Sequence, residues 1–399
     1  MRIGGEQAIV AWTFVLLGVF SSTVVKSQMP PTKDKPPEDF YVVPSLAVGE
    51  VYDDNLFFSP SSRRQGDWFT RVSPNILTGY QSTPLTLMGR YTFDSEFYNK
   101  HQELTTAQMR QQGSIELKSR PSPSLSLSAK GDYFQTRTPF ELNALTGTGV
   151  AVRRIRAESY SANPTLEYRP DSLTKAKGDY LYSKYLIQGG TSIDSHITSL
   201  DLDRRITAHD TVGPGYIGRH FTFGGFGSTT SHAFTLGWSR DLTAQTKVSL
   251  RAGPRFTAGA LDSKPEALAK IQHKVEGGEL SFTYSSSLAT IVGQGGPATA
   301  ESYGISGSFE PLQHFRLSVA PTLFKVTSQT FTSSVYLVNF EGSYQMTKEL
   351  ALRMSYLFYL QKGSFNPLTG STATNVEILR DLVWFGLVFT YPTRLEYLE

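Results

Sequence analysis

A segment of twelve residues near the C-terminal end, 350–361, alternates apolar and polar side chains with a period of two: LALRMSYLFYLQ. Its even positions carry leucine, methionine, tyrosine and phenylalanine, whereas its odd positions include Arg353, Ser355 and Gln361. Successive side chains of a β-strand point to opposite faces, so this pattern predicts a strand between two different environments. One face must lie in an apolar medium, and the other must accommodate an arginine.

The same alternation recurs along most of the chain in segments of about ten residues. Clear examples are residues 85–94, 247–256, 315–323 and 336–344. Aromatic residues make up 12% of the sequence and glycine is abundant, which is typical of β-proteins.

Two kinds of connection alternate between these segments. Short ones begin at Gln81, Arg120, Arg169, Thr207, Arg240, Glu276, Glu310 and Met346, and longer ones cover residues 53–66, 137–154, 258–264 and 362–373. Tight turns at one end and long loops at the other are typical of a transmembrane, antiparallel up-and-down β-barrel with its tight end in the periplasm. We predict an all-β fold of about eighteen strands, or about sixteen if residues 258–301 hold one long loop instead of two strands.

A water-soluble β-sandwich also alternates, and it is the alternative to a membrane barrel. Against it, the larger face carries Phe, Tyr and Leu in strand after strand with no covering helices. The smaller face holds Arg, Lys, Glu, Asn and Ser, which a single dry core could not bury unpaired. A barrel resolves the conflict, because its outer face meets lipid and its inner face meets water.

The N-terminal 27 residues, 1–27, have the build of a secretory signal peptide: Arg2 precedes an apolar run at 8–20, and a compact residue, Ser27, stands before the expected cut. The run is too short to span a bilayer as a helix, although an uncleaved anchor is the alternative. Residues 28–42 are rich in proline and charge, so we expect a flexible periplasmic lead-in, with the barrel in residues 43–399.

Several function classes find no support in the composition. The sequence has no cysteine, which excludes disulfides, a thiol nucleophile and a cysteine-ligated metal. Its net charge of +3 is small, and the basic residues are scattered, so we expect no nucleic-acid partner. The seven histidines are dispersed, no HExxH, GxSxG or P-loop pattern occurs, and GGFGST at residue 224 is most simply a turn.

We therefore expect no cofactor, no metal and no enzyme, although a catalytic triad assembled from distant strands is an alternative. Residues 53–55 and 201–203 offer oxygen ligands for calcium, yet neither segment completes a calcium-binding loop. Solvated acidic turns are the simpler interpretation.

The inward face of the predicted strands is richer in basic than in acidic residues. Pore-lining candidates are Arg71, Arg90, Arg110, Lys130, Lys247, Arg251, Arg255, Arg316 and Arg353, with Lys118 and Arg169 as further basic residues, against the acids Asp94, Glu96, Glu116, Asp132, Glu167 and Glu341. Such an imbalance in a wet channel would favour anionic solutes. Alternatively, the charges pair across the barrel and only brace it. The interpretation depends on register, because a slip of one residue reverses a strand's faces.

The last predicted strand, residues 382–392, reads LVWFGLVFTYP and places two aromatic residues at alternate positions after a glycine: Gly386, Phe389 and Tyr391. This resembles the C-terminal insertion signal that the barrel-assembly machinery reads. The strand departs from that pattern at Trp384, where a polar residue is more usual, and in the residues that follow Pro392.

The start of the predicted barrel resembles the β-barrel porin type 2 group, outer-membrane proteins often associated with exopolysaccharide systems. The resemblance is carried by PSLAVGEVYDDNLFFSP from Pro44 and GDWFTRVSPNILTGYQ from Gly66, and its residues are Tyr52, Asp53, Asp54, Asn55, Asp67 and Pro74. Beyond residue 81 only the rhythm of strands and short turns is shared. The resemblance implies an outer-membrane porin and no catalytic residues.

These observations predict a porin-like channel in the outer membrane of a Gram-negative bacterium, reached by signal-peptide-dependent export. We expect passage of a polysaccharide or another sugar-like or anionic solute, with outer-membrane lipid, the assembly machinery and polysaccharide export components as partners. A barrel enzyme acting on lipid or peptide, and a plugged structural or surface-binding barrel, are the alternatives. The sequence leaves open whether residues 137–154 fold inward and close the pore.

Overall fold

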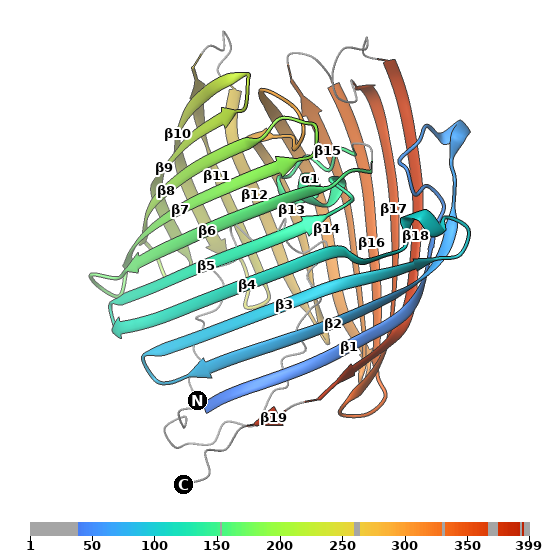
Figure 1. The fold of residues 1–399 in the computed structure, drawn as a ribbon. Coiled ribbons are helices and arrows are strands. Elements are labelled where there is room, and N and C mark those ends of the chain that lie inside the picture. The colour runs from blue at the N-terminus through green and yellow to red at the C-terminus, as the bar shows by residue number, and fades with distance from the viewer. Residues whose placement is uncertain are drawn as a thin grey trace.

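Eighteen antiparallel strands close into a barrel in the computed structural model of this chain (Figure 1). The structure describes residues 39–151, 154–258, 264–328, 332–365, 374–391 and 393–394. The first strand pairs with the second and also with the last long strand, from Ser45 opposite Thr390 to Asp53 opposite Leu382. This pairing closes the ring and leaves no free strand edge, as a sheet in hydrocarbon requires.

Strands of 12 to 17 residues make up the ring. They are β1 (Asp39–Asp53), β2 (Asp67–Gln81), β3 (Leu85–Tyr98), β4 (Thr106–Ser122), β5 (Leu125–Thr136), β6 (Ala157–Tyr168), β7 (Thr174–Ile187), β8 (Ile193–Arg205), β9 (Asp210–Phe223), β10 (Gly227–Asp241), β11 (Thr246–Thr257), β12 (Lys264–Val275), β13 (Gly278–Thr290), β14 (Pro297–Leu312), β15 (Phe315–Thr327), β16 (Thr332–Gln345), β17 (Leu350–Phe365) and β18 (Thr374–Thr390).

Four short elements complete the described secondary structure. Helix α1 (Phe140–Leu145) lies in the connection between β5 and β6, and single 3₁₀ turns occupy η3 (Ser61–Arg63) and η4 (Gln102–Leu104). A two-residue strand, β19 (Thr393–Arg394), pairs with the start of β1. No helix in the described part of the chain is long and apolar enough to cross a membrane.

The strand count of eighteen is confirmed, because residues 264–290 form two strands, β12 and β13, and not one long loop. The first strand begins earlier than we predicted. Residues 39–42, which we assigned to the lead-in because of their charged, proline-rich neighbours, pair with residues 78–81 of β2. The predicted signal peptide, 1–27, and the rest of the lead-in lie outside the described residues.

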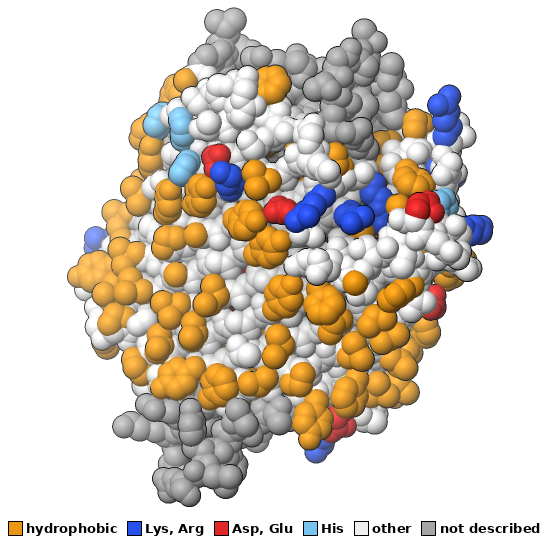
Figure 2. All heavy atoms as spheres, viewed as in Figure 1, with side chains coloured by type: hydrophobic (Ala, Val, Ile, Leu, Met, Phe, Trp, Pro, Cys, Tyr) orange, Lys and Arg blue, Asp and Glu red, His pale blue; other side chains and the backbone are white. Residues whose placement is uncertain are grey.

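The outer face of the barrel is apolar over most of its height, as Figure 2 shows for one side. Side chains at alternate positions point outward and stay exposed, among them Ile115 at 56%, Leu236 at 63% and Phe385 at 56%. The segment 350–361 behaves as predicted: Met354 and Tyr356 are exposed on the outside, whereas Tyr359 is buried on the inside. This belt and the closed ring make the fold a transmembrane β-barrel.

The two ends of the barrel differ in their connections. At the turn end, where β1 begins in Figure 1, β2–β3, β4–β5, β6–β7 and the later pairs are joined by short turns. In one such turn Asp171 accepts hydrogen bonds from the N–H groups of Leu173 and Thr174, which lower the pKa of its carboxyl. At the loop end most of the connections are longer, and the longest joins β5 to β6.

Candidate functional site: the barrel interior

The β5–β6 connection folds into the barrel at the loop end, where Figure 1 shows α1 behind the front strands. We call residues 138–151 the inner loop. Its apolar side chains are almost completely buried, including Phe140, Leu142 and Val150. Phe140 packs edge-on against Tyr359 of β17, with ring centroids 4.8 Å apart. A loop this well packed is held by the wall and occupies part of the interior.

The wall that receives the inner loop is apolar on its inward face, unlike the rest of the interior. Buried side chains from four strands form one cluster with the loop: Phe324, Val326, Val335, Leu337, Leu357, Tyr359 and Ile378. Apolar side chains that face inward in a barrel would meet water unless something covers them. The inner loop is their cover, so the sequence of β15 to β18 and the fold of the loop are matched.

Asn143 holds the inner loop together. Its side chain is fully buried, donates a hydrogen bond to the carbonyl oxygen of Val150 at 2.8 Å and accepts one from the N–H of Val292 at 2.7 Å. Val292 belongs to the β13–β14 connection, so one amide side chain ties two loops from opposite parts of the sequence. Removing it would leave a buried N–H and a buried carbonyl without their partners.

Tyr359 and Gln361 of β17 fasten the other end of the inner loop. The N–H of Ala151 donates to the Tyr359 hydroxyl at 2.9 Å and to the Gln361 side-chain oxygen at 2.8 Å. Gly149 precedes this contact with a φ of +59°, and a Cβ there would lie 2.9 Å from the ring of Phe324. Glycine is required at this position by both its backbone angle and the closeness of the wall.

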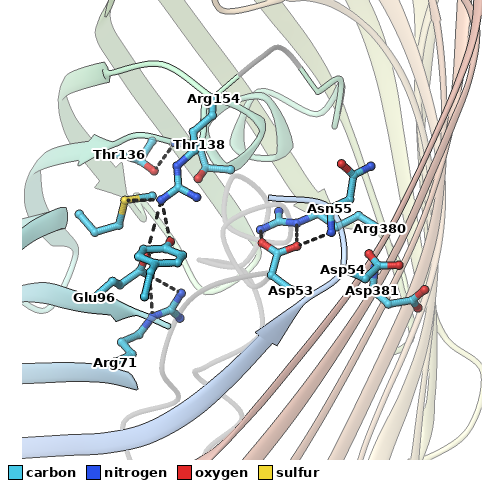
Figure 3. Close-up of polar contacts among 12 residues, drawn as sticks. Asp53, Asp54, Asn55, Arg71, Glu96, Thr136, Thr138, Arg154, Arg380 and Asp381 are labelled. Carbon is cyan, nitrogen blue, oxygen red and sulfur yellow. Dashed lines mark hydrogen bonds and ion pairs between the residues drawn. The ribbon is translucent and has the colours of Figure 1, made fainter. Parts of the chain in front are cut away.

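A second loop, between β1 and β2, is tied to the last strand by the residues that carry the family resemblance. Arg380 of β18 donates two hydrogen bonds to Asp53, at 3.0 and 2.5 Å, and both side chains are buried (Figure 3). The Asn55 side chain donates to the carbonyl oxygen of Leu379 at 2.8 Å. The pairing of β1 with β18 closes the ring, and we call this junction the closing seam. The contacts of Arg380 and Asn55 stabilise it.

Asp54 is outside the strands and accepts a hydrogen bond from the N–H of Asp381 at 2.7 Å. Partial burial raises the pKa of its carboxyl, although Arg64 and that N–H favour the charged form. The guanidinium of Arg380 also lies 4.4 Å from the centre of the Phe58 ring. Residues 53–55 thus act as structural ties, and the described residues contain no group of three potential metal ligands.

Arg71 and Arg154 both contact Glu96 near the loop end, on β2 and β3 beside the closing strand β1 (Figure 3). Arg71 donates to Glu96 at 2.7 Å, and the other oxygen of Glu96 lies 3.8 Å from Arg154. Arg154 also donates to the Tyr98 hydroxyl at 2.7 Å. One buried carboxylate therefore serves two arginines, and this charge cluster fixes the chain where the inner loop returns to β6.

A third charge cluster spans β9, β11 and β12. Glu266 accepts hydrogen bonds from Arg219 at 2.7 Å and from Arg255 at 3.3 Å, and all three side chains are buried. The sequence analysis missed Arg219 and Glu266, because pairing between β9 and β12 needs the register of three strands. We predicted that Arg255 lines the pore. Its side chain is instead buried against the barrel wall, because the guanidinium donates a hydrogen bond to Glu266.

Toward the turn end, the predicted inward basic residues sit beside acidic partners but stay partly exposed. Lys130 lies 2.8 Å from Asp132, and both side chains are about a quarter exposed. Arg251 lies between Asp201 at 2.7 Å and Asp203 at 3.1 Å. Water therefore reaches this part of the interior, where these two groups of charges are balanced locally.

The other lining candidates fall into three groups. Arg110 lies near the loop end, 3.9 Å from Asp94 and over the ring of Phe134. Lys247 and Arg316 lie at the turn end, beside Asp241 and Glu310. Arg90 and Arg353 are half-buried in the strands β3 and β17, and Arg353 shares a face with Glu341 of β16. That these residues line a conducting pore stays a prediction.

The predicted insertion signal lies at the closing seam. Phe389 and Tyr391 of the C-terminal segment point outward and are about half exposed, as lipid-facing aromatic residues would be. Gly386 stands opposite Gly49 of β1, and a Cβ on Gly386 would collide with the carbonyl oxygen of Val48. The ring of Trp384 fills the space beside the two glycines. Recognition by the assembly machinery stays a prediction.

The sequence analysis missed the residues that hold the loops: Asn143, Tyr359, Arg380 and Arg154. A signal for the first was present, because the apolar stretch FELNAL lies in the middle of a predicted loop. A loop exposed to water would rarely carry phenylalanine and two leucines so close together. Arg380 was missed because we began the last strand at residue 382, whereas β18 begins at Thr374.

No family model matches the sequence, and no curated protein matches it. Solved structures with a similar fold include OpdO of Pseudomonas aeruginosa, with 12% identity, a TM-score of 0.46 and coverage of 90% of this chain and 98% of that one. OccAB4 of Acinetobacter baumannii has 11% identity, a TM-score of 0.45 and coverage of 90% and 99%. The siderophore receptor PirA of the same species has 9% identity, a TM-score of 0.45 and coverage of 90% and 81%. Likeness of this degree is limited to barrel architecture.

Proposed function

We propose that this chain is a porin-like channel of the bacterial outer membrane, narrowed at the loop end by its inner loop. The observation that carries the proposal is the contrast between the two faces of one closed ring. The outside is apolar enough for lipid, and the inside toward the turn end carries partly exposed charges, such as Lys130 and Asp132. A wet, polar interior of about eighteen strands is wide enough for small solutes.

The solute we propose is a polysaccharide or another sugar-like molecule, in the setting of exopolysaccharide export. The resemblance of residues 44–81 to the porin type 2 group supports this. The local pairing of charges supports weak selectivity, since Arg251 and Lys130 each face acidic partners. We propose export through the signal peptide 1–27 and assembly through the C-terminal signal, and we assign no enzymatic activity.

Conductance measurements test the proposal directly. The full-length mature chain, folded in detergent, is added to planar bilayers, and liposome swelling is followed with sugars of increasing length. We expect discrete conductance steps and swelling that falls off with sugar length. Folded protein that gives neither conductance nor swelling would contradict a channel.

A plugged structural barrel is the second candidate, and the complete burial of Phe140, Leu142 and Asn143 favours it. The two candidates separate when the inner loop is removed. A plugged barrel conducts only without the loop, whereas a narrowed channel conducts with it and conducts more without it. Hydrolysis of lipid or peptide by the same preparation would point to the enzyme alternative.

A further inference from the structure

A cavity of about 740 Å³ opens at the loop end, above the tops of β4 to β7. Its apolar lining comes from four separate segments: Phe57 of the β1–β2 loop, Leu104 of η4, Ile155 of the β5–β6 connection, and Leu186 and Ile187 at the end of β7. The cavity has the size of a small-molecule site, which usually measures about 300–1,000 Å³. It lies away from the packed contacts of the inner loop with β15 to β18.

The polar lining of the cavity is strongly basic. Three arginines, Arg137, Arg154 and Arg156, line it with a single acidic residue, Glu158. Arg156 pairs with Glu158 at 2.5 Å, and Arg154 is engaged by the buried cluster around Glu96. Arg137 is exposed and forms no ion pair among the residues that the structure describes. The cavity therefore keeps an excess of positive charge beside apolar walls.

The cavity borders the lipid-facing surface of the barrel. Arg156 and Glu158 alternate along the chain with the same parity as the exposed Tyr160, so their side chains lie on the outward face of β6. On the neighbouring strands Lys184 of β7 stands opposite Asp194 of β8, 3.6 Å away, also on the outward face. Figure 2 shows charged side chains along the upper border of the apolar belt, where lipid headgroups lie.

Three histidines continue this polar border over β8 to β10. His196 and His220 stand opposite each other with ring centroids 6.3 Å apart, and His232 lies one strand further on. Each shares the outward face with exposed apolar residues of its own strand, such as Leu200 and Phe234. In Figure 2 histidine side chains gather near the upper ends of these strands. Polar side chains on the outer face are costly in the hydrocarbon core of a membrane, so they need polar groups, such as lipid headgroups, at the same depth.

We propose that the cavity binds the phosphorylated headgroup of an outer-leaflet glycolipid. Guanidinium groups are suited to phosphate because their planar fork donates two parallel hydrogen bonds. The apolar side chains Phe57 and Leu186 provide contact area for the sugar or acyl part of an amphiphile. The proposal goes beyond transport and rests only on the proposed outer-membrane location, so a failure of conductance would leave it standing.

Binding of a defined glycolipid tests this site. The purified full-length chain in detergent is titrated with a bisphosphorylated glucosamine glycolipid and with the same lipid after phosphate removal, followed by native mass spectrometry. We expect more than about tenfold tighter binding of the phosphorylated form, because charge-assisted hydrogen bonds from the arginines need the phosphate. Inorganic phosphate, tested as a competitor, should displace it only weakly, because it lacks the apolar contacts.

The double variant Arg137→Gln and Arg156→Gln should bind the phosphorylated glycolipid at least about tenfold more weakly. Lys362→Gln is the matched control: it removes an exposed cation at the same end of the barrel, on β17, and should change nothing. Arg137→Gln alone, which breaks no described ion pair, covers the case in which the double variant fails to fold.

Three outcomes would overturn the site. Equal binding of the phosphorylated and dephosphorylated lipids would remove the phosphate requirement. Displacement by inorganic phosphate as effective as by the glycolipid would reassign the cavity to free anions. Unchanged binding by folded Arg137→Gln and by the double variant would place the lipid elsewhere on the barrel.

Discussion

The interior of this barrel has two halves that follow the same alternation but differ in their surroundings. At the loop end the inward side chains of β15 to β18 are apolar and covered by the inner loop, and ion pairs such as Arg380 with Asp53 are buried. At the turn end the inward side chains are polar, and pairs such as Lys130 with Asp132 remain partly exposed. We expect the dry half to determine closure and stability, and the wet half to determine which charged and polar groups a solute contacts.

The difference teaches that an inward position in a barrel strand does not define an environment by itself. Leu337 and Glu341 both face inward from β16, one under the inner loop and the other toward the turn end. The strand tolerates both because the loop covers one, whereas the Asn339 side chain donates a hydrogen bond to the other at 3.0 Å. Changes in each half should therefore have separate consequences, and the largest should come from removing the cover.

Replacing residues 140–149 with a short Gly-Ser linker should raise the single-channel conductance several-fold. The inner loop occupies the interior at the loop end, and without it a ring of about eighteen strands leaves a wide lumen. Planar-bilayer recordings of the folded variant measure the effect. Replacing residues 242–245, the turn between β10 and β11 at the other end of the barrel, with the same kind of linker should leave conductance unchanged. Equal conductance of wild type and deletion variant would show that the narrowest point lies elsewhere.

Arg380→Gln should lower the free energy of unfolding by roughly 3 kcal/mol, because breaking a buried pair leaves Asp53 charged and unpaired. Urea denaturation in lipid vesicles, followed by Trp fluorescence, measures this. Lys362→Gln offers the contrast from the solvated rim: its pair with Glu377 is 3.0 Å long but about half exposed, so a loss below about 1 kcal/mol is expected. Similar losses in the two variants would refute a dry loop-end seam.

The wet and dry halves were not equally predictable from sequence. Alternation in residues 350–361 predicted which side chains face lipid, because a period of two is a local property. Partners across the barrel are not local. Glu266 meets Arg219 only through the register of intervening strands, and pairing of this kind made Arg255 a bracing residue instead of a lining one.

The inner loop shows the second limit of the sequence. Its burial follows from contacts between residues about 200 positions apart, such as the N–H of Ala151 and the Tyr359 hydroxyl. Apolar inward residues on β15 to β18 were visible as interruptions of the polar face, for example Leu357 and Tyr359. Only a structure connects them to the FELNAL stretch, because nothing in either segment specifies the other.

Asn143→Ala should loosen the inner loop without removing it. Two buried backbone groups, the carbonyl of Val150 and the N–H of Val292, would lose their partners at a cost of about 1–3 kcal/mol. We expect frequent transitions to a higher conductance level and faster proteolysis within residues 138–151. Asn163→Ala is the control, since that side chain lies on β6 away from the loop and donates to the carbonyl oxygen of Tyr180 at 3.1 Å, near the surface. Quiet, unchanged currents from Asn143→Ala would mean that apolar packing alone holds the loop.

Arg251→Glu should produce the smallest effect, a shift of the permeability ratio toward cations with little change in stability. Arg251 lies between Asp201 and Asp203 in the wet half, and its reversal would place three carboxylates together on an inner wall that water reaches. Reversal-potential measurements in a salt gradient detect the shift. It should shrink as salt rises from about 0.1 to 1 M, because the screening length falls from about 10 to 3 Å.

Arg353→Glu, facing Glu341, should act in the same direction, whereas Arg255→Glu should impair folding, because Arg255 is buried against Glu266. A selectivity shift from Arg255→Glu as large as that from Arg251→Glu would remove the distinction between the two halves, since it would require water and ions to reach the loop-end wall.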